Sequence, residues 1–100
     1  MIKKLKKLGF TKIGKFNKIG KNINTYKFKG TIGNNNRIDD DVTLKGNIEI
    51  MNNVHIGRGC TISAGKGGII FENFSTISNY VQVFGKSDDF IGNYLSTENP

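Results

Sequence analysis

The chain has 100 residues, of which 36% are hydrophobic and none is Trp, so it forms at most one small domain without a thick core. No apolar run reaches 18 residues, which argues against a transmembrane helix, and the basic start lacks the apolar stretch of a signal peptide. Cys60 is the only cysteine, which excludes an internal disulfide and fits a reducing compartment. We therefore expect a cytoplasmic protein.

The net charge of +7 is unevenly distributed along the chain. Residues 1–30 carry ten Lys and no acid, whereas residues 31–100 carry two Arg and three Lys against eight acids. Within the basic N-terminal segment, residues 1–12, Ile2, Leu5 and Leu8 fall on one side of a short helix. That helix either caps the end of the following structure, which we favour, or makes a peripheral contact with an anionic membrane. No nucleic acid partner is expected, because the segment lacks the aromatic stacking strings of the usual binding modules.

Aliphatic residues recur at every sixth position from the middle of the chain onward. The first series is Ile32, Ile38, Leu44, Ile50, Ile56 and Ile62. The residues four positions after them are Asn36, Val42, Ile48, Val54, Cys60 and Lys66. After a glycine-rich slip over 65–68, the six-residue pattern resumes at Phe71, Ile77 and Val83, and it has precursors at Ile13 and Ile19.

A six-residue period excludes a helix, because successive aliphatic side chains would spread around its whole circumference. It fits strands, in which an even spacing keeps side chains on one face, and three strand-and-turn units make a triangular coil of 18 residues. We therefore predict an all-β fold, a parallel β-helix of about 3–4 coils over residues 13–84. Gly33 and Gly57 are predicted at turns that need unusual backbone angles, as are the Asn and Asp residues near them. Asn36 is expected to bond turn backbone inside the coil, and Lys66 to sit on a bulging loop.

Four stretches in this order resemble the hexapeptide-repeat acyltransferases, in particular the O-acetyltransferases of bacterial surface polysaccharides and related sugars. They are Ile32-Gly33-Asn34-Asn35, Asn52-Asn53-Val54-His55-Ile56, Gly67-Gly68-Ile69, and Ser87-Asp88-Asp89-Phe90 with Gly92. The resemblance implies a left-handed parallel β-helix, a homotrimer, acetyl-CoA as the acyl donor and a carbohydrate acceptor. Members of this family usually continue for several more coils. Residues 85–100 are therefore interpreted as an acidic loop at the end of a truncated chain, whose catalysis alone is doubtful.

Acetyl transfer from a thioester to a hydroxyl requires a base that takes the hydroxyl proton. His55 is the only histidine, precedes an inward Ile56 and so should point outward, where its imidazole suits this role near pH 7. In sugar acetyltransferases of the family the catalytic histidine falls at a position that is Asp88 here. Either the aspartates of this loop bind the acceptor and His55 is the base, or an aspartate is itself the base.

The remaining polar candidates are predicted to bind the substrate. They are Ser87 and Asp89 beside Asp88, and Asp40 within Asp39-Asp40-Asp41, a run that we favour as turn residues. Because no Cys/His cluster is present, we expect no metal. The competing function is a non-catalytic β-solenoid that serves as an assembly or binding module, and the repeat alone does not decide between the two.

Overall fold

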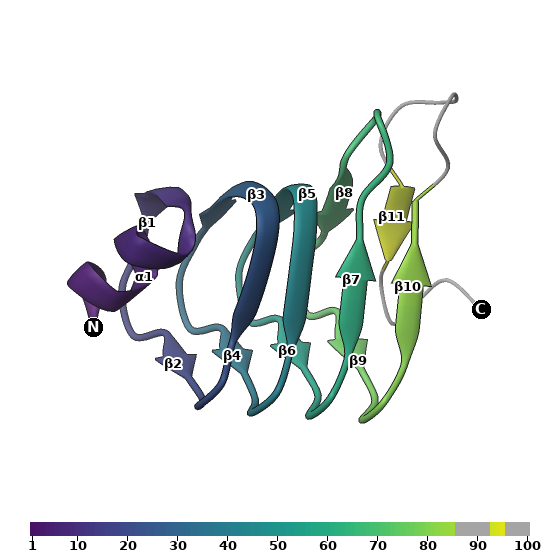
Figure 1. Cartoon of the computed structure of the whole chain (residues 1–100). Helices are drawn as coiled ribbons and strands as arrows, with labels where there is room; N and C mark the ends of the chain where they lie inside the picture. The colour runs from purple at the N-terminus through teal and green to yellow at the C-terminus, as the bar shows by residue number, and fades with distance from the viewer. Residues whose placement is uncertain (86–92, 96–100) are drawn as a thin grey trace.

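The structure is a computed structural model of the chain that describes residues 1–85 and the backbone of residues 93–95. A short helix is followed by strands wound around one axis (Figure 1). The helix α1 covers Ile2–Leu8. The strands are β1 Phe10–Ile13, β2 Lys18–Ile19, β3 Asn24–Ile32, β4 Arg37–Ile38, β5 Thr43–Ile50, β6 His55–Ile56, β7 Thr61–Ser63, β8 Ile69–Phe71, β9 Thr76–Ile77, β10 Gln82–Phe84 and β11 Asn93–Leu95.

The strands of the described residues pair in parallel, each with the equivalent strand of the next coil. One face is the sheet β2-β4-β6-β9. The long strands β3 and β5 bend around a corner, so their first parts join β7 and β10 and their second parts join β1 and β8. The result is a three-sided β-solenoid of about four turns, which confirms the predicted fold. Its left-handed winding stays a prediction from the family resemblance.

The coils differ in length. Asn36 and Val54 are equivalent and 18 residues apart, whereas Asn52 and Asn73 are 21 apart. The longer spacing arises between β7 and β8, where the chain projects from the solenoid (Figure 1) and Lys66 is exposed. The predicted slip and the bulging loop are therefore confirmed.

The interior is filled by the predicted six-residue series. Ile32, Ile38, Leu44, Ile50, Ile56 and Ile62 are all at most 2% exposed. Of the positions four residues later, Val42, Ile48, Val54 and Cys60 are buried as deeply. Burial of one such aliphatic side chain contributes about 1.5–3 kcal/mol relative to leaving it in water. This continuous column is therefore the main source of the fold's stability.

Asn36 is a polar residue inside the column, and it bonds backbone as predicted. Its Nδ2 donates to the carbonyl oxygen of Met51 at 2.9 Å, and its Oδ1 accepts from the amide of Val54 at 2.8 Å. One coil earlier, Asn17 Oδ1 accepts from the amide of Asn36 at 3.0 Å. Two buried asparagines thus tie three successive coils together at one corner.

The corner glycines Gly33 and Gly57 are required for space rather than for dihedral angle, so the predicted reason was wrong for them. Neither has a positive φ. A Cβ on Gly33 would lie 2.4 Å from Asn52 Oδ1, and one on Gly57 would lie 2.5 Å from Asn79 Oδ1. The left-handed conformation falls instead on nearby residues such as Asn35, Asn53 and Asp41, with φ of 60°, 57° and 64°, which confirms the prediction for Asn and Asp.

Helix α1 covers the N-terminal end of the solenoid (Figure 1). Leu5 is fully buried in the core, and Leu8 packs against the core with partial exposure. The helix stops at Gly9, whose φ of 125° suits a residue without a side chain. The predicted cap is therefore confirmed. Within the described residues, no helix combines the length and apolar character that a bilayer crossing requires.

Candidate active site

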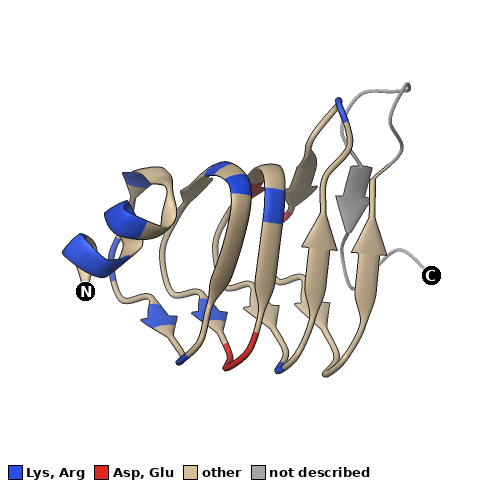
Figure 2. Ribbon diagram, viewed as in Figure 1, with Lys and Arg blue, Asp and Glu red and all other residues tan. Residues whose placement is uncertain are grey.

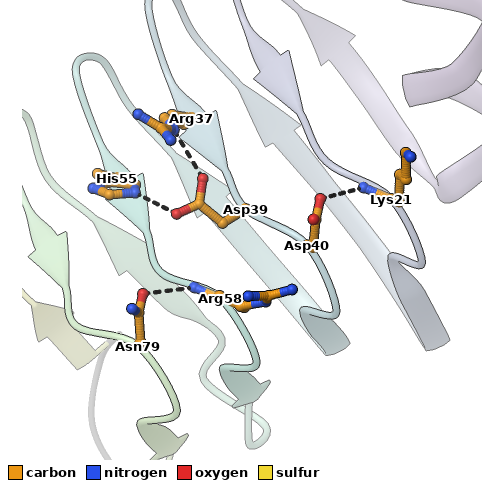
Figure 3. Close-up of polar contacts among 7 residues, drawn as sticks. All are labelled: Lys21, Arg37, Asp39, Asp40, His55, Arg58 and Asn79. Carbon is orange, nitrogen blue, oxygen red and sulfur yellow. Dashed lines mark hydrogen bonds and ion pairs between the residues drawn. The ribbon is translucent and has the colours of Figure 1, made fainter.

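His55 lies on β6 and points away from the buried Ile56, as predicted. Its side chain is 39% exposed, and its Nε2 lies 2.8 Å from Asp39 Oδ2 (Figure 3). In the coil before, the residue paired with His55 is Arg37, whose Nε donates to Asp39 Oδ1 at 2.8 Å. The carboxylate of Asp39 therefore contacts both an imidazole and a guanidinium.

Asp39 reaches His55 from a corner position that the neighbouring coils give to glycine. The amides of Gly20, Asp39 and Gly57 make the same bond, each to the carbonyl oxygen of the aliphatic residue one coil further on. A Cβ on Gly20 would lie 2.3 Å from Asp40 Oδ1, because an Asn or Asp side chain of the next coil fills that space.

The coil beyond Asp39 carries Arg58 in place of such an Asn or Asp. Asp40 Oδ1 accepts from the amide of Lys21, and Asn79 Oδ1 accepts from the amide of Arg58, so these two acceptors flank the exception (Figure 3). Arg58 has no acceptor with which to fill the corner. Asp39 thus stands where the neighbouring coils have glycine, and Arg58 of the following coil stands in place of the Asn or Asp that would fill the corner. The corner is therefore open, and the Asp39 carboxylate fits beside His55.

The groups around Asp39 determine its ionisation, and its contact with His55 determines which ring nitrogen carries the proton of a neutral imidazole. Partial burial, the largest single influence, raises the pKa of the Asp39 carboxyl, but the hydrogen bonds and charges of His55 and Arg37 together hold that pKa below its ordinary 3.8. Asp39 is thus an ionised acceptor at neutral pH. A neutral His55 must then carry its proton on Nε2, which leaves Nδ1 as the basic nitrogen.

A hollow of about 450 Å³ opens on the same face of the solenoid. Lys18, Arg37 and Arg58 bring cationic groups to its lining, and Asp39 and Asp40 bring carboxylates. Such a lining can donate hydrogen bonds to, and accept them from, a polyhydroxylated ligand. The described part of the chain contains no cluster of three His, Cys, Asp or Glu side chains that could hold a metal ion.

Of the predicted site residues, the structure describes His55 and Asp40, and His55 is not among the residues that line the hollow. Asp40 lines the hollow, but its Oδ1 also accepts from the amide of Lys21 at 2.7 Å, which is a turn role. Ser87, Asp88 and Asp89 lie outside the described residues.

Sequence analysis missed the contact between Asp39 and His55. The signal that would have identified it is the register: one coil of 18 residues before His55 is Arg37, and Asp39 follows two residues later, just beyond the end of β4.

Comparisons with known proteins agree with this architecture. Residues 29–64 match the family described as bacterial transferase hexapeptide (six repeats). The chain is 33% identical over 96 residues to a dTDP-4-amino-4,6-dideoxy-D-glucose acyltransferase of Escherichia coli, a match that covers 92% of this chain and 50% of the relative. No solved structure matches the chain significantly.

The repeat, the solenoid and this relative together agree with the class that the resemblance predicted, since residues 29–64 match the hexapeptide-repeat transferases and the chain is similar to an acyltransferase. The particular relative is named as a sugar acyltransferase, and this chain spans about half of that protein's length.

Proposed function

We propose that this protein transfers an acetyl group from acetyl-CoA to a hydroxyl of a sugar in a surface polysaccharide or related glycan. His55 is the general base, and Asp39 is the residue that positions it. The observation that carries the proposal is the 2.8 Å contact between His55 Nε2 and Asp39 Oδ2 on an outward face. The match of residues 29–64 to a transferase family and the similarity of the chain to a sugar acyltransferase support it.

The reaction follows from the protonation states of the pair. His55 Nδ1 takes the proton of the acceptor hydroxyl as its oxygen attacks the carbonyl carbon of the thioester. The resulting imidazolium is stabilised by the Asp39 carboxylate through Nε2. Collapse of the tetrahedral intermediate breaks the carbon–sulfur bond, and the departing thiolate of CoA takes the proton back from His55. The products are the sugar acetyl ester and free CoA.

In this proposal the other polar residues bind the acceptor. Asp40 accepts hydrogen bonds from sugar hydroxyls at the edge of the hollow, and Ser87 and Asp89 also bind the acceptor. Asp88 is the alternative base. The proposed assembly is a homotrimer in the cytoplasm, where acetyl-CoA is available, and sedimentation would report a mass of ~33 kDa for it, three times the 11.1 kDa chain.

The test is release of free thiol from acetyl-CoA by the purified chain with a panel of acceptors. Because the relative is named for an amino sugar, the panel contains sugars with only hydroxyls and sugars with an amine. We expect His55→Ala to lower kcat by about 10²–10⁴-fold, the usual contribution of a general base. Asp39→Asn should lower kcat by roughly tenfold or more and leave the KM for acetyl-CoA almost unchanged.

Asp41→Asn is the matched control, because this neighbouring carboxylate lies 3.8 Å from Arg58 and does not contact His55. Full activity in His55→Ala with loss in Asp88→Asn would assign the base to Asp88. Release with amine acceptors alone would correct the bond formed from ester to amide. No release with any acceptor would contradict the proposal and favour a non-catalytic solenoid.

A further inference from the structure

The N-terminal end of the solenoid is strongly cationic. All ten lysines of residues 1–30 are exposed, and the first acidic residue of the chain is Asp39. Figure 2 shows the positive residues on α1 and the first coil, with negative residues only beyond that coil. None of the ion pairs of the described residues involves a lysine. The positive charge at this end is therefore available to an external partner.

An apolar patch lies within this cationic surface. Phe16 is 79% exposed, Ile2 is 55% exposed and Met1 is 60% exposed. All three line one hollow of about 320 Å³ between α1 and the first corner, together with Leu5 and Lys15. We call these three residues and the surrounding Lys3, Lys6, Lys7 and Lys15 the leader surface.

Phe16 lies at a corner of the solenoid with most of its side chain exposed. Its φ is 64°, a conformation that is unfavourable for a bulky side chain and suits Asn. The next two coils carry Asn35 and Asn53 at the equivalent corner, with φ of 60° and 57°. Phe16 is thus an exposed aromatic side chain at a corner where the next two coils carry asparagine, and it differs from the similarly exposed Phe74 in lying among the lysines of the N-terminal end.

We propose that the leader surface docks the protein on an anionic lipid bilayer. Phe16, Ile2 and Met1 enter the boundary between headgroups and acyl chains, and the lysines contact the anionic headgroups. The apolar patch is what favours a bilayer over a nucleic acid, because phosphate contacts require cations but no apolar centre. Leu5, which a helix lying alone on a membrane would insert, is instead buried in the core, so the apolar contribution comes from residues on both sides of the hollow.

The test is flotation of the full chain with vesicles that contain phosphatidylglycerol, and with vesicles of phosphatidylcholine alone. We expect binding only to the anionic vesicles, with a partition coefficient that falls as salt is added. Removal of Lys3, Lys6 and Lys7 together by substitution with Gln should reduce it by roughly 100-fold, at about fivefold for each charge.

Phe16→Asn is the decisive variant, because it keeps all charges and installs the residue found at this corner in the next two coils. It should reduce the partition coefficient about fivefold or more while the protein stays folded by circular dichroism. Phe74→Asn is its matched control: Phe74 has a φ of 66° and is 65% exposed at the same corner, but lies in a later coil without the lysines. Unchanged binding of Phe16→Asn, or equal retention of wild type and Phe16→Asn by duplex DNA with no flotation, would overturn the proposal.

Discussion

At the scale of single residues, the site depends on one position where a glycine of the repeat is replaced. Asp39 takes the corner place of Gly20 and Gly57, and Arg58 follows where an acceptor would otherwise stand. The carboxylate then bonds Arg37 and His55 at 2.8 Å each. Since the first of these groups is always cationic and the second becomes so on accepting a proton, the ionised form of Asp39 is the one that stabilises both the fold and the proposed base.

This arrangement makes the free energy of unfolding depend on pH in the acidic range. The folded pKa of Asp39 lies below 3.8, so its contribution is fully present above that value and is lost as the pH falls through the lower folded pKa. We expect Asp39→Asn to lower the free energy of unfolding by up to about 1 kcal/mol at pH 6, the range for a partly exposed ion pair. The difference from wild type should vanish in stronger acid.

Thermal unfolding of both proteins between pH 6 and about pH 2 measures this difference, since the pKa values of carboxylates span that range. Asp41→Asn, whose carboxylate is 3.8 Å from Arg58, should show a smaller change throughout. A difference between wild type and Asp39→Asn that grew as the pH fell would contradict the assignment.

The sequence predicted the direction of a side chain where the local pattern determines it. It did not predict a contact between coils, which depends on the register of the strands. His55 was predicted to point outward because it precedes an aliphatic residue of the series. Asp39 was not singled out, because three consecutive aspartates are chemically alike until the pairing of Arg37 with His55 shows which of them faces the imidazole.

At the scale of elements, the corners hold the coils in register. The strands of the sheet that carries His55, β2, β4, β6 and β9, contain only two residues each, so they supply few ladder bonds. The buried amides of Asn17 and Asn36 add bonds from coil to coil beside this face. The asparagine at position 36 is therefore a stabilising residue, although the period would favour an aliphatic one.

We expect Asn36→Val to destabilise the protein, although Val54 occupies the equivalent place one coil later. The substitution leaves the amide of Val54 and the carbonyl of Met51 without their buried partners. Loss of these bonds should cost about 2–4 kcal/mol, which urea unfolding measures. Cys60→Val, at the place that Val42 holds one coil earlier, should change stability by less than about 1.5 kcal/mol. An Asn36→Val variant as stable as wild type would refute this role for the asparagine.

Most of the fold was predictable at this scale because an even period fixes which side chains face inward. The loop between β7 and β8 was predictable as well, since Gly65 to Gly68 interrupt the period. The reason for the corner glycines was not predictable, because a clash between a Cβ and Asn52 or Asn79 involves residues about one coil away.

At the scale of the whole molecule, the solenoid is a stack in which each coil contacts mainly its neighbours. Its N-terminal end is closed by α1, through Leu5 above all. The free energy of unfolding of such a stack is approximately the sum of contributions from each coil and from each interface between neighbouring coils. A destabilising substitution at one end therefore promotes local unfolding first at that end.

Leu5→Ala should therefore expose the first coil to local opening. Truncation of a fully buried leucine costs about 2–5 kcal/mol. In hydrogen exchange, the amides of β1 and β3 should lose protection more than those of β6 and β9. Leu8→Ala, where the side chain is already partly exposed, should have the smaller effect. Equal loss of protection along the whole stack would show that the molecule unfolds as one unit and not from its end.

The loop that carries Lys66 has a further consequence for engineering. The chain gains an odd number of residues there, yet the side chains of Ile69 and Phe71 still point into the interior. Successive side chains alternate between inside and outside along a strand, but this alternation does not continue through a corner. A foreign peptide, such as an affinity epitope or a dye-labelling tag, can accordingly be spliced in at Lys66 without exchanging the two sides of any strand. The solenoid would then serve as a rigid scaffold that displays the insert.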